Sequence, residues 1–216
     1  MPSPSLTIKL KDPRKVKRFL TRLEKKQIPF ATALAITKTL QRAKVGVIKQ
    51  AKKDIDRPTP FTLRGFRVQS ANKRTLTGRL FIAPIQENYL RYQIFGGVRR
   101  PKGTALALPP AKPEAGGVRL DRYGNVPRAQ RARAQLGKGA FSGKVGNVAG
   151  IWKPPTRTKT GKIRKGSRMR LLLAYEQQAV YRPRYRFFQR AQGEINANFP
   201  REFDRAFRRA TKTARR

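Results

Sequence analysis

The chain has no cysteine and no histidine among its 216 residues, and it has 11 acidic residues against 52 lysines and arginines. Without cysteine there are no disulfide bonds and no thiolate chemistry, which permits an intracellular protein but does not prove one. Without histidine the commonest general base and the commonest metal ligand are both missing. We therefore expect a protein that is not an enzyme and that holds no cofactor and no metal.

Long apolar runs are also missing. No apolar segment of the sequence approaches the roughly 18 residues that a membrane-spanning helix needs. The first ten residues, MPSPSLTIKL, lack the basic start and the apolar run of a signal peptide. The sequence predicts no contact with a membrane.

What the chain does contain is positive charge, with a formal net charge of +41 at pH 7. A chain this basic repels itself and is most stable when a polyanion or an acidic partner supplies the missing charge. Duplex DNA carries one negative charge per ~1.7 Å of axis, so this charge matches roughly 70 Å of duplex. A domain of this length is only about 40 Å wide. Part of the basic surface must therefore face another partner or the solvent.

A second absence is local, because no acid occurs between Asp121 and Glu176, a segment with fourteen lysines and arginines. Its most basic stretch, GIWKPPTRTKTGKIRKGSRMR, covers residues 150–170. One interpretation is a solvated loop that only confers solubility. The other is contact with phosphates, for which cations among Thr, Ser and Gly are suited. Trp152 is the lone aromatic residue there, so we expect contact with a duplex backbone, without base stacking or sequence recognition. The candidate DNA-facing residues are Arg157, Lys159, Lys162, Arg164, Lys165 and Arg168.

The residue pattern in the first half predicts a fold built around a long helix. Alternating residues predict a strand at 6–10, and Asp12-Pro13 is typical of a helix start. A long amphipathic helix is expected to restart at Pro29 and to end near Asp54, with Leu34, Leu40 and Val47 in the core. Further elements are predicted as a hairpin of strands at 62–70 and 76–84, and a short helix at 87–97 that ends on Gly96 or Gly97.

The second half predicts a long loop region between regular elements. Residues 98–168 are expected to be mostly irregular, with a turn at DRYGN (121–125), a helical turn or two within 127–137, and loop at 137–147. A strand is predicted at 170–181, and a helix from Phe187 that Pro200 interrupts. The predicted class is α+β: an antiparallel sheet packed against a long N-terminal helix, with a C-terminal helix and long basic loops. The predicted division is an N-terminal arm over 1–28 and a single domain over 29–216.

The acidic residues give little indication of a catalytic or metal-binding site. Asp54 and Asp56 are expected to cap the long helix or to pair with neighbouring lysines, and Glu202 and Asp204 to lie in the first turn after Pro200, near the helix dipole. Asp121 is expected to close a turn. The glycines at 137–146 do not match a phosphate-binding loop, because the first glycine is one residue too far from Gly143-Lys144 and Val145 replaces the required hydroxyl.

The order of these blocks resembles the minor tail proteins of tailed phages, of the lambda Z tail-completion type. The similarity lies in DRPTPFT after the long helix, in IFGGVRR, in DRYGN, and in YRFFQRA followed by FPREFDRAFRRA. It covers about 29–97, 118–136 and 168–210. The resemblance implies a non-enzymatic virion protein of the neck, assembled in the host cytoplasm as a homo-oligomeric ring around packaged double-stranded DNA. The neighbours implied are tail terminator, tail tube, head-completion or portal proteins.

A different class of protein also fits the residues. A free, sequence-independent nucleic-acid-binding protein, such as a ribosomal or nucleoid-like component, would show the same excess of charge. The sequence lacks a recognition motif of a dedicated DNA reader, which favours the virion protein over this alternative.

Overall fold

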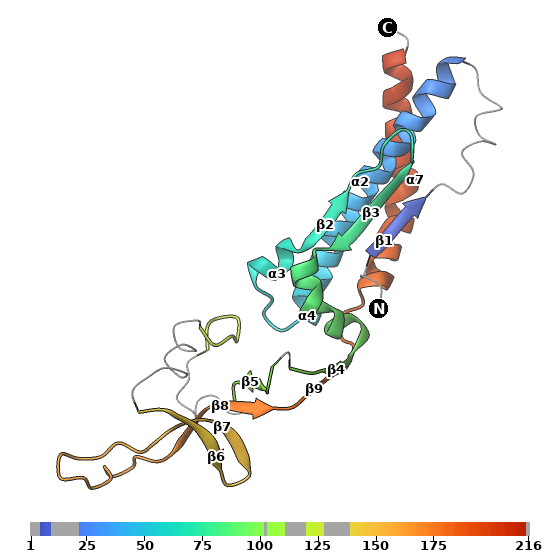
Figure 1. The fold of residues 1–216 in the computed structure, drawn as a ribbon. Coiled ribbons are helices and arrows are strands. Elements are labelled where there is room, and N and C mark those ends of the chain that lie inside the picture. The colour runs from blue at the N-terminus through green and yellow to red at the C-terminus, as the bar shows by residue number, and fades with distance from the viewer. Residues whose placement is uncertain (1–4, 10–21, 102, 111–119, 128–138, 215–216) are drawn as a thin grey trace. The chain divides into compact units, whose positions relative to one another are not determined.

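The computed structural model describes residues 5–9, 22–101, 103–110, 120–127 and 139–214 (Figure 1). These residues form two compact units. The chain leaves the first unit after Gly96 and returns to it at Arg182. The α+β class with antiparallel sheets is confirmed. The predicted single domain over 29–216 differs from this division, because residues 97–181 make a compact unit of their own.

Two long helices dominate the first unit. Helix α2 (Arg22–Asp54) has 33 residues, or about 50 Å at 1.5 Å per residue. Helix α7 (Phe187–Ala214) runs beside it in the opposite direction (Figure 1). Small side chains let the two helices approach closely over a cluster of buried alanines. These are Ala31 and Ala35 of α2 and Ala206 and Ala210 of α7.

A three-stranded antiparallel sheet covers part of α2. It is made of β1 (Ser5–Lys9), β3 (Thr77–Ile82) and β2 (Phe66–Gln69), in that order across the sheet. At Gly78 of β3 an added Cβ would lie 2.6 Å from Leu40 Cδ1, so glycine allows the strand to contact the helix here. The prediction of Leu40 and Val47 as core is confirmed, since both are fully buried, whereas Leu34 is only partly buried.

The predicted hairpin and short helix are confirmed with shifted boundaries. Residues 62–64 belong to a short helix, α3 (Pro60–Arg64), rather than to the first strand of the hairpin. The Thr59 hydroxyl accepts a hydrogen bond from the Thr62 amide and caps this helix. Helix α4 (Pro84–Phe95) begins three residues before its predicted start and ends at Gly96, whose φ of 72° favours glycine.

Both predicted helix breaks at proline are wrong. Pro29 lies inside α2 and Pro200 inside α7. An interior proline removes one backbone hydrogen bond and costs about 3 kcal/mol. Here Ala31 and Ala206 of the alanine cluster pack within two turns of Pro29 and Pro200, and this tertiary packing offsets the local cost. Accordingly Glu202 and Asp204 lie within a continuous helix, not in a first turn.

Of the predicted N-terminal arm over 1–28, the structure describes residues 5–9 and 22–28. Strand β1 pairs with β3 and forms an edge of the sheet, and α2 crosses the expected boundary at residues 28 and 29. The predicted helix start at Asp12-Pro13 lies outside the described residues.

The second unit contains two small sheets. In one, β4 (Gly97–Arg99) pairs with β9 (Ala179–Tyr181). The other is antiparallel, in the order β5 (Leu106–Leu108), β8 (Arg170–Glu176), β7 (Val148–Lys153) and β6 (Phe141–Val145). Its buried core consists of Val126, Ile151, Leu172 and Leu173.

The expectation of irregular structure over 98–168 is therefore wrong where β4, β5, β6 and β7 form. Strand β6 lies in the glycine-rich segment that was predicted as loop, with Gly143 opposite Gly150 in the register. Pairing with β7 decides the conformation here, because strand formation depends more on neighbours than on local propensity. The helical turns predicted within 127–137 fall almost wholly outside the described residues.

Candidate nucleic-acid interface

The candidate DNA-facing residues all lie in the connection between β7 and β8. The two strands pair as far as Lys153 and Arg170. Residues 154–169 therefore close a hairpin, and we refer to them as the basic loop. At Gly150, near its base, an added Cβ would clash with the Leu173 carbonyl oxygen, so a glycine is required where β7 contacts β8.

The tip of the basic loop is itself a small hairpin. Arg157 and Ile163 form an isolated antiparallel bridge. The Thr158 amide donates to the Lys162 carbonyl at 2.7 Å, and the Gly161 amide donates to the Thr158 carbonyl at 3.0 Å. Gly161 has φ of 83°, as the last position of a three-residue hairpin loop requires. The sequence T-K-T-G-K thus has the turn chemistry that this hairpin needs.

A second turn follows the tip. The Ser167 amide donates to the Arg164 carbonyl at 2.9 Å, and Gly166, the third residue of this turn, has φ of 77°. A positive φ at this position is typical of a type II turn. The Ser167 hydroxyl also accepts from the Thr156 amide at 2.6 Å, which ties the two sides of the loop together. The basic loop is therefore a folded element rather than an irregular chain.

The six candidate residues are all exposed, but the hairpin does not place them on one face. Side chains alternate along a strand, so Arg157 shares a face with Ile163, its bridge partner, while Lys162 and Arg164 lie on the other face. Lys159 lies in the first turn and Lys165 in the second. Arg168 follows the second turn. The sequence predicted their exposure correctly, whereas their division between two faces could not be read from it.

Arg157 differs from the other five candidates. Its guanidinium Nη1 donates to the Gly161 carbonyl oxygen at 2.8 Å, across the tip of the hairpin. Part of its hydrogen-bonding capacity therefore holds the turn. The loop hydroxyls are similarly occupied, since Thr158 Oγ1 bonds Thr160 Oγ1 at 2.8 Å and Ser167 Oγ bonds Thr156 Oγ1 at 3.2 Å. The cations, rather than the hydroxyls, are left to contact a ligand.

Among the described residues, the basic loop has no acidic partner. Within the described chain, ion pairs form in the first unit, and none of them involves a candidate residue. Of the two acids that the structure describes in the second unit, Asp121 is engaged in its own turn, where Oδ1 accepts from the amides of Tyr123 and Asn125 at 2.9 and 2.8 Å. Glu176 lies at the far end of β8. The predicted turn at DRYGN is confirmed.

The acids of the first unit have structural partners. Asp56 binds Arg57 through both carboxylate oxygens at 3.0 Å, and this hydrogen bonding lowers the pKa of Asp56. Asp54 accepts from Gln50 at 2.8 Å. The predicted lysine partners are therefore replaced by Arg57 and Gln50.

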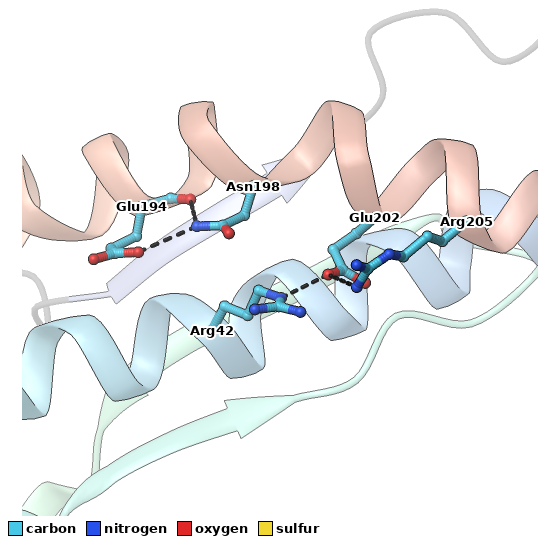
Figure 2. Close-up of polar contacts among 5 residues, drawn as sticks. All are labelled: Arg42, Glu194, Asn198, Glu202 and Arg205. Atoms are coloured by element: carbon cyan, nitrogen blue, oxygen red, sulfur yellow. Dashed lines mark hydrogen bonds and ion pairs between the residues drawn. The ribbon is translucent and has the colours of Figure 1, made fainter.

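Glu202 has a role that the sequence did not indicate. Its Oε1 lies 2.6 Å from Arg42 Nε of α2 and 3.5 Å from Arg205 Nη1, and its side chain is only 8% exposed (Figure 2). One carboxylate thus links the two helices and holds two guanidinium groups. Asp204 pairs with Arg208 at 3.0 Å on the surface of α7.

No helix within the described ranges is long and apolar enough to cross a membrane. Those ranges also contain no cluster of three or more acidic side chains that could hold a metal ion.

No family model, no curated protein and no solved structure matches the chain. The resemblance to phage tail-completion proteins stays a prediction.

Proposed function

We propose that the chain is a structural, non-enzymatic protein whose basic loop contacts the phosphate backbone of double-stranded DNA without reading its sequence. Together with the sequence resemblance, this makes it a tail-completion protein at the head–tail junction of a tailed phage. It would assemble there as a ring around the DNA channel, beside other tail, head-completion or portal proteins.

The observation that carries the proposal is a set of cations on a folded loop that have no ion-pair partner within the described part of the chain. The six candidate residues are exposed, and none of them has an ion-pair partner among the described residues. The internal hydrogen bonds of the loop fix its backbone before a ligand binds. A fixed backbone lowers the ordering cost of binding. Lysine and arginine side chains then supply contacts to phosphates, which carry no sequence information.

A matched pair of variants tests this contact. In the loop variant, the six candidate residues are all replaced by glutamine. In the control variant, glutamine replaces six exposed cations of the first unit that have no ion pair in the described structure: Lys38, Lys49, Lys52, Arg67, Arg79 and Arg201. Both variants lose the same net charge, so a difference between them reports position rather than total charge.

We expect the loop variant to bind duplexes of unrelated sequence much more weakly than the control variant does, and by the same factor for each duplex. Circular dichroism should show that both variants fold, since all twelve side chains are exposed. Equal affinities of the two variants would contradict a specific role of the loop.

The genes that neighbour its gene distinguish the virion protein from the alternative, a free nucleic-acid-binding protein. Tail and portal genes beside its gene would support the virion protein, and ribosomal genes would support the alternative. A cryo-EM map of the assembled particle would test the position of the loop. A loop on the outer wall, against acidic protein, would show that its charge serves assembly instead.

A further inference from the structure

A cavity of about 390 Å³ lies in the first unit, where the chain enters α7. Its walls come from the end of α4 and from residues 183–189. Pockets that hold small molecules are typically about 300–1,000 Å³. The cavity can therefore hold one small ligand or one unit of a larger one, and the residues that line it are not those of the basic loop.

The inner wall of the cavity is fixed. Tyr185 is 1% exposed, and its hydroxyl donates to the Val47 carbonyl oxygen of α2 at 2.9 Å. The amides of Arg184 and Tyr185 both donate to the Gln93 carbonyl of α4, at 2.8 and 2.9 Å. Phe187 is fully buried beside Tyr185. The segment that forms the cavity is thus held by both α2 and α4, which fixes its backbone.

Two aromatic side chains line the cavity at its outer part. Phe95, the last residue of α4, is 44% exposed, and Phe188 is partly buried. Their ring centroids are 5.8 Å apart, with an angle of 44° between the planes. Phe95 therefore offers an accessible ring surface beside a second ring. Flat aromatic groups, nucleobases among them, stack on such rings.

Two arginines line the same cavity. Arg184 and Arg186 are both exposed, on either side of the buried Tyr185. None of the described residues that line the cavity is acidic. Asp56 is near enough to Arg184 for that arginine to contribute to its lowered pKa, but the main partner of Asp56 is Arg57. The charge of the cavity is therefore complementary to an anion.

We infer that this cavity binds a nucleotide of a single-stranded nucleic acid, with its base on Phe95 and its phosphate at Arg184 and Arg186. A nucleotide unit combines a flat ring with an anion, the two features that the lining residues complement. A base within a duplex is stacked on its neighbours and does not offer its face to Phe95. The site is therefore distinct from the duplex contact proposed for the basic loop, and it does not depend on that contact.

Fluorescence anisotropy with a labelled eight-nucleotide oligo(dT) and the full chain tests this site. Titrations at about 0.5 M salt weaken phosphate contacts but leave stacking largely intact. We expect Phe95→Ala to weaken binding of oligo(dT) roughly five- to hundred-fold, as the loss of one base–aromatic stack does. Phe95→Tyr, which keeps a ring, should bind as the unchanged chain does. The control is Phe61→Ala, a similarly exposed (47%) phenylalanine that does not line the cavity, and it should have no effect.

Other ligands distinguish the chemistry of the site. An abasic oligonucleotide of the same length should bind Phe95→Ala and the unchanged chain equally, and a duplex should also show no dependence on Phe95. Replacing Arg184 and Arg186 by glutamine should weaken oligo(dT) binding more than replacing Arg67 and Arg79, two exposed arginines of the sheet. Free thymidine monophosphate should compete only at far higher concentration than the oligonucleotide.

Four results would each overturn the inference. They are equal effects of Phe95→Ala and Phe61→Ala, an equal loss with the abasic strand, competition by free thymidine monophosphate as strong as that by the oligonucleotide, and tighter, Phe95-dependent binding of an acidic peptide that contains phenylalanine. Loss of duplex binding in the loop variant bears on the proposed function instead, so the two proposals fail separately.

Discussion

The ion pair of Glu202 shows how one side chain can hold two elements together. The carboxylate is buried, whereas the Arg42 side chain is 48% exposed. Removing the arginine leaves a buried charge with only the longer contact to Arg205, while removing the carboxylate leaves an arginine that water can solvate. The loss of Arg42 should therefore lower the stability of the fold more than the loss of Glu202 does.

This asymmetry predicts unequal stabilities. Arg42→Met should lower the free energy of unfolding by about 2–3 kcal/mol and Glu202→Gln by about 1 kcal/mol. Urea unfolding of both variants measures the difference. Equal losses, or a larger loss for Glu202→Gln, would show that the carboxylate does not need its partner across the helices.

Tyr185 gives a prediction about pH. Burial, and next the charge of Asp54, raise the pKa of Tyr185 well above its ordinary value near 10. In the unfolded chain the phenol ionises near pH 10, whereas in the folded protein it stays neutral. Its contribution to stability is therefore complete below pH 10 and is lost as the pH rises above that value.

Tyr185→Phe should remove both the hydroxyl and this pH dependence. We expect a loss of about 1 kcal/mol at pH 8, because the buried bond to the Val47 carbonyl disappears. Between pH 9 and 11 the unchanged protein should lose stability faster than the variant does. Parallel stability curves for the two proteins over this range would argue against a buried neutral phenol.

Among the elements, α2 is the helix on which the first unit is built. Leu40 faces the core and is fully buried, whereas Val45 on the same helix is 66% exposed. Leu40→Asp would bury an unpaired charge, which costs several kcal/mol, and we expect it to prevent folding. Val45→Asp makes the same change on the exposed side and should change stability by less than about 1 kcal/mol. Circular dichroism and expression as soluble protein compare them, and a folded Leu40→Asp variant would contradict the facing of α2.

The sequence predicted elements well where packing and local pattern agree. The end of α2 near Asp54, the hairpin of β2 and β3, and the end of α4 at Gly96 all follow from periodicity and turn residues. It failed where tertiary contacts outweigh local signals. The packing of the alanine cluster keeps both long helices continuous across a proline. Pairing with β7 makes the glycine-rich segment at 141–145 a strand.

The candidate interface could likewise be predicted only in part from the sequence. Charge and exposure depend on composition, so the sequence identified the six cations of the basic loop. Their division between two faces depends on the turn at Gly161, and the bond that ties Arg157 to that turn depends on the folded hairpin. The cavity at residues 183–189 was missed, because the aromatic residues that alternate with arginine in RPRYRFF, Tyr185 and Phe187, are buried core residues and the exposed ring of Phe95 lies far from them in the sequence.

For the whole molecule, a net charge of +41 affects stability. Like charges repel within the folded chain, and added salt screens them. We expect the Tm to rise when sodium chloride is increased from about 0.05 M to 0.5 M, since the Debye length falls well below 10 Å. A Tm that falls with salt over this range would mean that ion pairs outweigh the repulsion.

The central claim, that the basic loop contacts DNA phosphates, is tested most directly by the salt dependence of duplex binding. Each phosphate contact contributes about −0.9 to the slope of log K against log salt, so six contacts contribute about −5. Because the candidate residues lie on two faces of the hairpin and Arg157 is held at its turn, we predict that the slope of the loop variant is shallower than that of the unchanged chain by up to this amount, whereas the control variant keeps the original slope. A loop variant with an unchanged slope, or a control variant that loses as much, would contradict it.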